Sequence, residues 1–246
     1  MDRVVYVAMT GAREITRQQA AVSHNLANVS THGFKAELSV FRALPVVGEG
    51  AKTRAFVLET TPASDFTSGV LQQTDRSLDI AVRGAGWIAV QGADGQEAYT
   101  RMGQLETSPN GVLQTLSGLN VLGDGGTIAV APDQEILIAK DGTVSTVPLG
   151  ENRNAVTIAG RIKLVNPPEK DLIRGEDGLF RMKSAQPAEA DANVTIAAGA
   201  LETSNVNPAD ALVNMISLSR QFDTQMRLLR AAEENHKAGD KIVARS

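Results

Sequence analysis

Apolar and small residues recur at helical spacing over about the first 29 residues of the chain. They follow one another at alternating intervals of three and four positions, which is the heptad pattern of a coiled-coil seam. The members of this seam are Val5, Ala8, Ala12, Ile15, Gln19, Val22 and Leu26. Because the seam is rich in alanine, it predicts a helix that permits close approach of a partner. The run from Asn28 to Gly33 then predicts the end of the helix, with Gly33 in a left-handed conformation.

A second helical pattern begins near residue 207 and continues towards the end of the chain. Asn207 is a favourable N-cap, Pro208 suits the first helical position, and Asp210 places a carboxylate in the first turn. An apolar stripe follows, formed by Leu212, Met215, Leu218, Phe222, Met226 and Leu229. The pattern predicts a helix of about 35 residues, or ~50 Å at about 1.5 Å per residue.

The middle of the chain shows strand patterns instead. Residues 34–75 have no firm period and contain Pro45, Gly48 and Pro62, which predicts an extended arm with short strands. Residues 76–199 contain short β-rich runs separated by turn signals such as Asn110-Gly111 and Asp141-Gly142. The runs lie at 78–82, 87–91, 112–115, 127–130, 136–139, 156–159 and 162–165. They favour a β sandwich or an irregular barrel.

These patterns together predict an α+β chain. We expect residues 1–33 and 200–246 to form a domain in which two long helices pair as a coiled coil. Residues 34–75 are expected to form the arm, and residues 76–199 a β-rich outer domain. Two helices bury only one face each, so such a pair keeps apolar strips that usually mark protein contacts. The alternative is that both helices pack onto the β domain as an ordinary α+β core.

Composition excludes several classes of function. The formal net charge is −4 and the basic residues are scattered, so no nucleic-acid interface is expected. The chain has no cysteine, which excludes disulfides and thiolate chemistry. No apolar stretch approaches the ~20 residues of a membrane span, and no signal peptide is evident, so direct membrane insertion is not expected.

The residues that usually carry chemistry are also sparse. The three histidines, His24, His32 and His236, lie outside the β-rich middle, and no metal site is expected. Residues 84–89 match the dinucleotide pattern G-x-G-x-x-A, but a strand pattern follows where a helix is required. We therefore predict no catalytic residues and no cofactor, and we do not expect an enzyme.

Three motifs, one near each end of the chain and one in the middle, resemble in their order the bacterial flagellar rod and hook protein family. Residues 23–35 (SHNLANVSTHGFK) are similar to the N-terminal signature of that family. Residues 199–207 (GALETSNVN), continuing through Met215-Ile216 and Arg220-Gln221-Phe222, are similar to its C-terminal signature. Residues 78–87 and 98–103 resemble the core of the family. Within the family the beginning of the chain is most similar to the proximal-rod members, with the distal-rod members as the close alternative.

The resemblance implies a structural subunit of the flagellar basal-body rod. Its terminal helices would form the inner coiled-coil layer around the export channel, and the β domain would lie outside. The flagellar type III apparatus would export the subunit without a cleaved signal peptide. Its partners would be proximal-rod and distal-rod subunits and further copies of itself. The assembled rod would cross the periplasm and transmit motor torque.

We predict the subunit interface from the helical stripes and the two junction signatures. The predicted residues are Val5, Ile15, Val22, Leu26, Asn28, Gly33, Phe34, Lys35, Asn205, Asn207, Leu212, Met215, Leu218, Phe222, Met226 and Leu229. The sequence alone leaves two other hypotheses open. One is a soluble β-rich binding module with a helical dimerisation element, and the other is an enzyme with a site in the β domain.

Overall fold

The protein, seen in a computed structural model, divides into two compact units. The structure describes residues 3–39, 41–45, 55–59, 63–131, 134–148 and 156–243. Residues 1–29, 36–65 and 206–246 form the first unit, which we call the helical unit. Residues 30–35 and 66–205 form the second, which we call the β unit.

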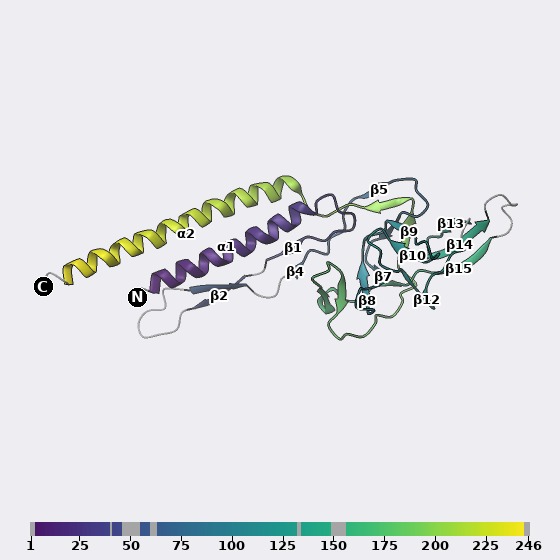
Figure 1. Ribbon diagram of the computed structural model, residues 1–246, viewed down its shortest axis with the longest axis horizontal. Helices are drawn as coiled ribbons and strands as arrows, with labels where there is room; N and C mark the ends of the chain where they lie inside the picture. Colours follow the sequence, from purple (N-terminus) through teal and green to yellow (C-terminus); the bar gives the residue numbers. More distant parts are fainter. Residues whose placement is uncertain are drawn as a thin grey trace. The chain divides into compact units, whose positions relative to one another are not determined.

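Two long helices dominate the helical unit. They are α1 (Arg3–Ala27) and α2 (Pro208–Val243), which lie side by side and run in opposite directions (Figure 1). The Asn28 side-chain amide donates to the carbonyl of His24 at 2.9 Å and so caps the end of α1. At the start of α2, Asn207 Oδ1 accepts from the backbone N–H of Ala209 at 3.0 Å, which is the predicted N-cap. The expected α+β chain, with a helix at each end and a mainly β middle, is confirmed.

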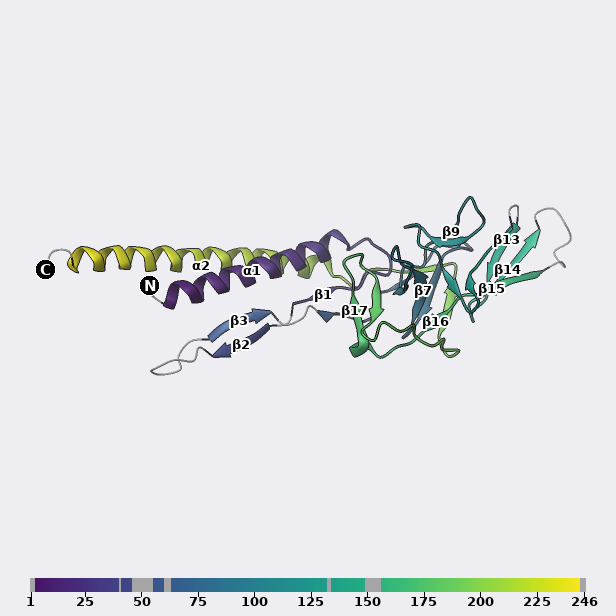
Figure 2. The same ribbon diagram turned by 60° about the horizontal axis from the view of Figure 1, so that its bottom comes forward.

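Two short strand pairs from the predicted arm lie along α1 (Figure 2). Strand β1 (Glu37–Leu38) pairs with β4 (Ala63–Ser64), and β2 (Phe41–Pro45) pairs with β3 (Ala55–Glu59), both antiparallel. Residues 40, 46–54 and 60–62 of the predicted arm lie outside the described residues. Residues 34–35 and 66–75 of the arm belong to the β unit. The arm therefore contributes to both units.

The β unit is built from short antiparallel strands. The strands are β5 (Leu71–Gln73), β6 (Ile80–Arg83), β7 (Trp87–Gln91), β8 (Glu97–Thr100), β9 (Leu105–Thr107), β10 (Leu113–Thr115), β11 (Leu122–Gly123), β12 (Gly126–Thr127), β13 (Gln134–Ile138), β14 (Thr143–Pro148), β15 (Thr157–Arg161), β16 (Leu164–Val165), β17 (Leu172–Arg174), β18 (Phe180–Met182), β19 (Thr195–Ala198) and β20 (Ala200–Glu202). The largest sheet has the order β16-β7-β8-β18-β17, and β13, β14 and β15 form a second one.

Two hydrophobic cores lie on opposite faces of the large sheet. Successive side chains of a strand point to opposite faces, so β7 contributes Ile88 and Val90 to the larger core and Trp87 and Ala89 to the smaller one. The ring of Trp87 lies 4.7 Å from that of Phe180, centre to centre, in the smaller core. A strand that is buried on both faces has a continuous run of apolar residues in its sequence. This explains why residues 87–91 are recognisable as a strand from the sequence.

Tyr99 hydrogen-bonds the segment around Ala188, which precedes β19, to the edge of the smaller core. Its hydroxyl donates to Glu97 Oε1 at 3.0 Å and accepts from the backbone N–H of Ala188 at 2.7 Å. Lys163 Nζ lies 2.8 Å from Glu97 Oε2 and neutralises the carboxylate. Burial, opposed by the Ala188 N–H, raises the pKa of Tyr99 from 10.0 to about 12, and the Glu97 carboxylate adds to the increase.

A Tyr6→Phe variant is expected to show this raised pKa directly, because the chain has only two tyrosines. Tyrosinate absorbance of the folded variant should rise with a midpoint near pH 12, and in denaturant near pH 10. Because the pKa of Tyr99 is higher in the folded than in the unfolded protein, protonated Tyr99 contributes to the free energy of unfolding. This contribution is fully present below pH 10 and is lost as the pH rises towards 12. A folded midpoint equal to the denatured one would contradict this network.

Candidate assembly interface

The two helices of the helical unit meet along a seam with heptad spacing. On α2 the buried and half-buried side chains follow intervals of four and three residues. They are Ala211, Met215, Leu218, Phe222, Gln225, Leu229 and Ala232, and Met226 beside Gln225 is half-buried as well. On α1 the predicted seam is likewise buried or half-buried throughout. A Cβ built on Gly11 of α1 would stand 3.4 Å from the side-chain amide of Gln225, which is ordinary van der Waals contact, so Gly11 faces α2 at this level.

Most of the predicted helical interface residues lie on the packed faces of their own helices. Val5, Ile15, Val22 and Leu26 do so on α1. Met215, Leu218, Phe222, Met226 and Leu229 do so on α2. Leu212 is different, because it is 49% exposed while its neighbour Ala211 is buried.

Leu212 belongs instead to an exposed apolar patch at the beginning of α2. Its other members are Val213 and Ile216, which are 65% and 56% exposed. At about 100° per residue, the three side chains fall within an arc of about 100° on the side of α2 that does not face α1. We call these three residues the outer apolar patch. Large apolar side chains gathered on one exposed helix face usually mark a protein contact.

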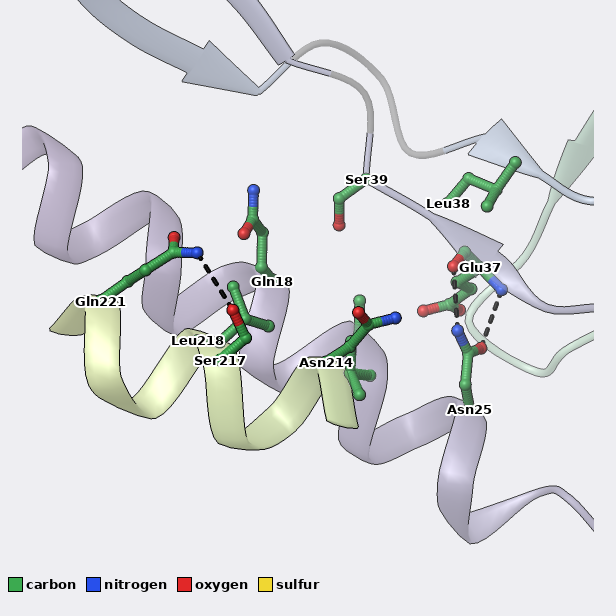
Figure 3. A pocket seen from close by; sticks show the side chains of 11 residues that line it. Gln18, Asn25, Glu37, Leu38, Ser39, Asn214, Ser217, Leu218 and Gln221 are labelled. Atoms are coloured by element: carbon green, nitrogen blue, oxygen red, sulfur yellow. Dashed lines mark hydrogen bonds between the residues drawn. The ribbon is translucent and has the colours of Figure 1, made fainter. Parts of the chain in front are cut away.

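A groove of about 340 Å³ lies between α1, α2 and β1 (Figure 3). Amide and hydroxyl side chains point into it from both helices and from the arm, and we call it the amide groove. The polar residues that line it are Gln18, Asn25, Ser39, Asn214, Ser217 and Gln221. Its apolar lining comes from Ala21, Val22, Leu38 and Leu218. Glu37 is the one charged residue among the described residues that line the groove.

Asn25 fastens β1 to α1 beside this groove. Its side-chain Nδ2 donates to the carbonyl of Glu37 at 2.9 Å, and its Oδ1 accepts from the Glu37 N–H at 2.8 Å. The amide thereby occupies the place of a neighbouring strand at the edge of β1 (Figure 3). His24 Nδ1 lies 3.2 Å from Glu37 Oε1, one residue further back along α1. The shape of the groove thus depends on two adjacent residues of the predicted N-terminal signature.

The other end of that signature is held inside the β unit by buried charges. Lys35 Nζ lies 2.7 Å from Glu202 Oε1, and Arg101 Nη1 lies 2.9 Å from Glu202 Oε2. Lys35 and Glu202 are 1% exposed and Arg101 is 4% exposed. We call these three residues the buried charge cluster. The N–H of Gly69 also donates to Glu202 Oε1, at 2.9 Å, so the carboxylate is fully engaged.

Several backbone contacts surround the buried charge cluster. The N–H of Gly33 donates to the carbonyl of Glu202 at 2.8 Å. Gly33 has a φ of +70°, and a Cβ there would stand 2.3 Å from the carbonyl group of Arg101, so only glycine fits. The N–H of Asn205 donates to the carbonyl of Phe34 at 3.4 Å. The segment that follows α1 is therefore bonded directly to the segment that precedes α2.

Four predicted interface residues, Gly33, Phe34, Lys35 and Asn205, thus make contacts inside the β unit. Asn28 and Asn207 cap the two helices. Arg101 and Glu202 are not among the predicted residues, although both lie within the segments that carry the family resemblance. No pattern of polarity marks them, because charged side chains are usually solvated.

Among the described residues, no group of three or more histidine or acidic side chains is arranged to hold a metal ion. No helix within the described part of the chain has the length and apolar character that crossing a membrane requires.

Three protein-family profiles match the chain, and together they span both units. Residues 5–35 match the flagella basal body rod protein profile. Residues 81–146 match the flagellar hook protein FlgE/F/G D1 domain, and residues 197–242 match the C-terminal profile of the flagellar basal body rod FlgEFG proteins. The three matches include the helical seam and all three residues of the buried charge cluster, one residue in each match.

Full-length relatives agree with these profiles. The chain is 42% identical to the flagellar basal-body rod protein FlgF of Salmonella typhimurium and 40% identical to that of Escherichia coli, in each case over all of both chains. It is 30% identical to the rod protein FlgG of Buchnera aphidicola over 94% of this chain and 95% of that one. The predicted family resemblance is therefore confirmed. The chain belongs to the family of bacterial flagellar basal-body rod proteins, and within that family it is FlgF-like.

Proposed function

We propose that this chain is a structural subunit of the flagellar basal-body rod, in its proximal part, and that it has no catalytic role. The observation that carries this proposal is the identity of 40–42% with FlgF proteins over the whole chain. Because the identity extends over both units, neither unit has been replaced by an unrelated domain with a different function. The arrangement of α1 and α2, with apolar side chains left exposed on α2, suits a subunit that completes its burial by assembly.

We further propose that the two helices pair as a coiled coil and that assembly proceeds through them. The heptad spacing of the seam and the position of Gly11 opposite Gln225 support this pairing. In this proposal residues 1–33 and 200–246 form the inner domain around the export channel, 34–75 the arm, and 76–199 the outer domain. The seam residues hold the helix pair together, whereas Leu212 meets a neighbouring subunit.

The proposed partners follow from this role. They are other proximal-rod and distal-rod subunits, further copies of this chain, and the type III export apparatus during secretion. Export without a cleaved signal peptide would deliver the chain to the periplasmic part of the basal body. The assembled rod would then transmit motor torque.

Deletion of the gene in its source bacterium tests the function. We expect cells that do not swim and basal bodies whose rods stop early, as seen by electron microscopy, with both defects restored by the wild-type gene. Rods that reach full proximal length but lack the distal part would instead indicate a distal-rod subunit. Normal swimming with complete basal bodies would overturn the rod assignment.

A further inference from the structure

The two exposed sides of α2 differ in chemistry. The outer apolar patch lies on one side, and the part of the amide groove that α2 contributes lies on the other. At about 100° per residue, Leu212 and Gln221 are separated by about 180° around the helix axis. Ile216 and Gln221 are separated by about 140°. The groove residues of α2 also include Asn214, Ser217 and Leu218, so the centres of the two surfaces are about 140° apart, while Val213 and Ser217 at their nearer edges are separated by about 40°. One chain therefore presents a projecting apolar surface and a recessed surface on different sides of α2.

We propose that the outer apolar patch of one copy docks into the amide groove of a second copy of this chain. This inference rests on the proposed function, because it names the partner and the contact through which the subunits would assemble. The occupant of the groove would be the first turns of the neighbouring copy's α2, with Leu212 and Ile216 entering it.

The lining of the groove suits aliphatic side chains. Val22 and Leu218 form part of its lining, and Leu38 is 47% exposed there. A volume of about 340 Å³ accommodates more than one such side chain, since a water molecule takes about 30 Å³ of the liquid. The surrounding amides and hydroxyls are neutral, so removing their water costs less free energy than removing water from charged groups, and Glu37 is the one carboxylate in the described lining.

The charges beside the two surfaces have opposite signs. Glu37 places a carboxylate at the groove, and its side chain is 28% exposed. Arg220 is exposed one turn beyond Ile216 on α2, next to the outer apolar patch. Docking of the patch brings this guanidinium towards the groove and its carboxylate. An ion pair at the rim of an interface fixes orientation and partner choice more than it adds affinity.

A contact between two different surfaces also has the geometry that an extended assembly requires. A surface that packs on its own counterpart in a second copy closes a dimer. A surface that packs on a different one leaves a free copy of each at the two ends, so further subunits add, giving a ring if the rotation closes and an open helical array if it does not. The arrangement on α2 is of this second kind.

The absence of cysteine from the chain permits a direct test. Gln18→Cys places a thiol at the groove, and Ile216→Cys places one in the outer apolar patch. The two variants are co-expressed in the deletion strain, and isolated basal bodies are treated with a short bis-maleimide. We expect a cross-linked species of twice the 26.0 kDa chain mass in the mixture, and none when either variant is expressed alone.

Controls separate this contact from chance encounters and from the proposed function. Glu176→Cys, at an exposed turn of the β unit, should give no product with Gln18→Cys. In the mixture, Arg220→Glu added to the Ile216→Cys chain should lower the yield, whereas Arg220→Lys should preserve it. Leu212→Cys reports the same contact if Ile216→Cys cells do not swim.

Each remaining outcome is decisive. Cross-linking by Ile216→Cys alone would show that the patch packs on itself, which overturns the docking proposal. Absence of any product in swimming cells would also overturn it and would leave the rod assignment intact. Normal swimming of the deletion strain would contradict the proposed function itself.

Discussion

Replacing Glu202 by glutamine is expected to lower the free energy of unfolding of the β unit by about 3–5 kcal/mol, the range for breaking a buried ion pair by removing one partner. The Glu202 carboxylate accepts hydrogen bonds from Lys35, Arg101 and the Gly69 N–H. An amide offers one oxygen in place of two. Its nitrogen would face one of the donors, and both buried cations would lose their counter-charge.

Urea denaturation followed by tryptophan fluorescence measures this loss, because the single tryptophan, Trp87, lies in the β unit. Arg101 also lies over its ring, with the guanidinium carbon 5.3 Å from the ring centre. Glu176→Gln, which removes an exposed carboxylate, serves as the control and should change stability by less than about 0.5 kcal/mol. Equal midpoints for both variants would show that the buried charge cluster does not stabilise the fold.

Lys35→Met provides a graded comparison within the same cluster. It removes one of the two cations and leaves Arg101 and Glu202 as a neutral pair, so the loss should be smaller than for Glu202→Gln. The bond from Lys35 Nζ to the carbonyl of Thr67, at 2.8 Å, is lost as well. A larger loss for Lys35→Met would mean that the ammonium group, and not the balance of charge, is what the cluster requires.

The helices were predictable because their signals are local. Caps depend on residues next to the helix end, and Asn207 and Pro208 mark the start of α2 correctly. The face of α2 that packs on α1 was predicted less well at its beginning. Leu212 is more hydrophobic than Ala211, yet the alanine is buried and the leucine is exposed. Hydrophobicity alone predicts that the larger residue is the buried one. The alternating intervals of four and three residues predict the alanine instead, because Ala211 lies four residues before Met215 and Met215 lies three before Leu218.

The buried charge cluster was not predictable from one sequence. Lys35, Arg101 and Glu202 are distant along the chain and belong to residue types that are rarely buried. Only the fold brings them together. Strands such as β17 and β18 were missed for a related reason, because Arg174 and Arg181 interrupt their apolar pattern. These arginines bond to backbone or carboxylate groups, which makes a strand position tolerable for them.

The second large effect is expected from aspartate at two neighbouring positions of α2 that face in different directions. Leu218 is 8% exposed in the seam with α1, whereas Ile216 is 56% exposed in the outer apolar patch. Leu218→Asp would bury a charge between the two helices, so it should loosen the helix pair in the isolated protein. Ile216→Asp should leave the isolated protein within about 0.5 kcal/mol of the wild type.

Both variants are nevertheless expected to abolish swimming, for different reasons. Leu218→Asp would remove the paired helices, which circular dichroism and limited proteolysis of the purified chain would detect. Ile216→Asp would leave a folded chain whose docking surface carries a charge, so that rods stop early in electron micrographs. Thr224→Asp, exposed two turns further along α2, is the control and should swim normally. Normal swimming of Ile216→Asp would show that subunits assemble without the outer apolar patch. Normal folding of Leu218→Asp would show that the seam does not hold the two helices together.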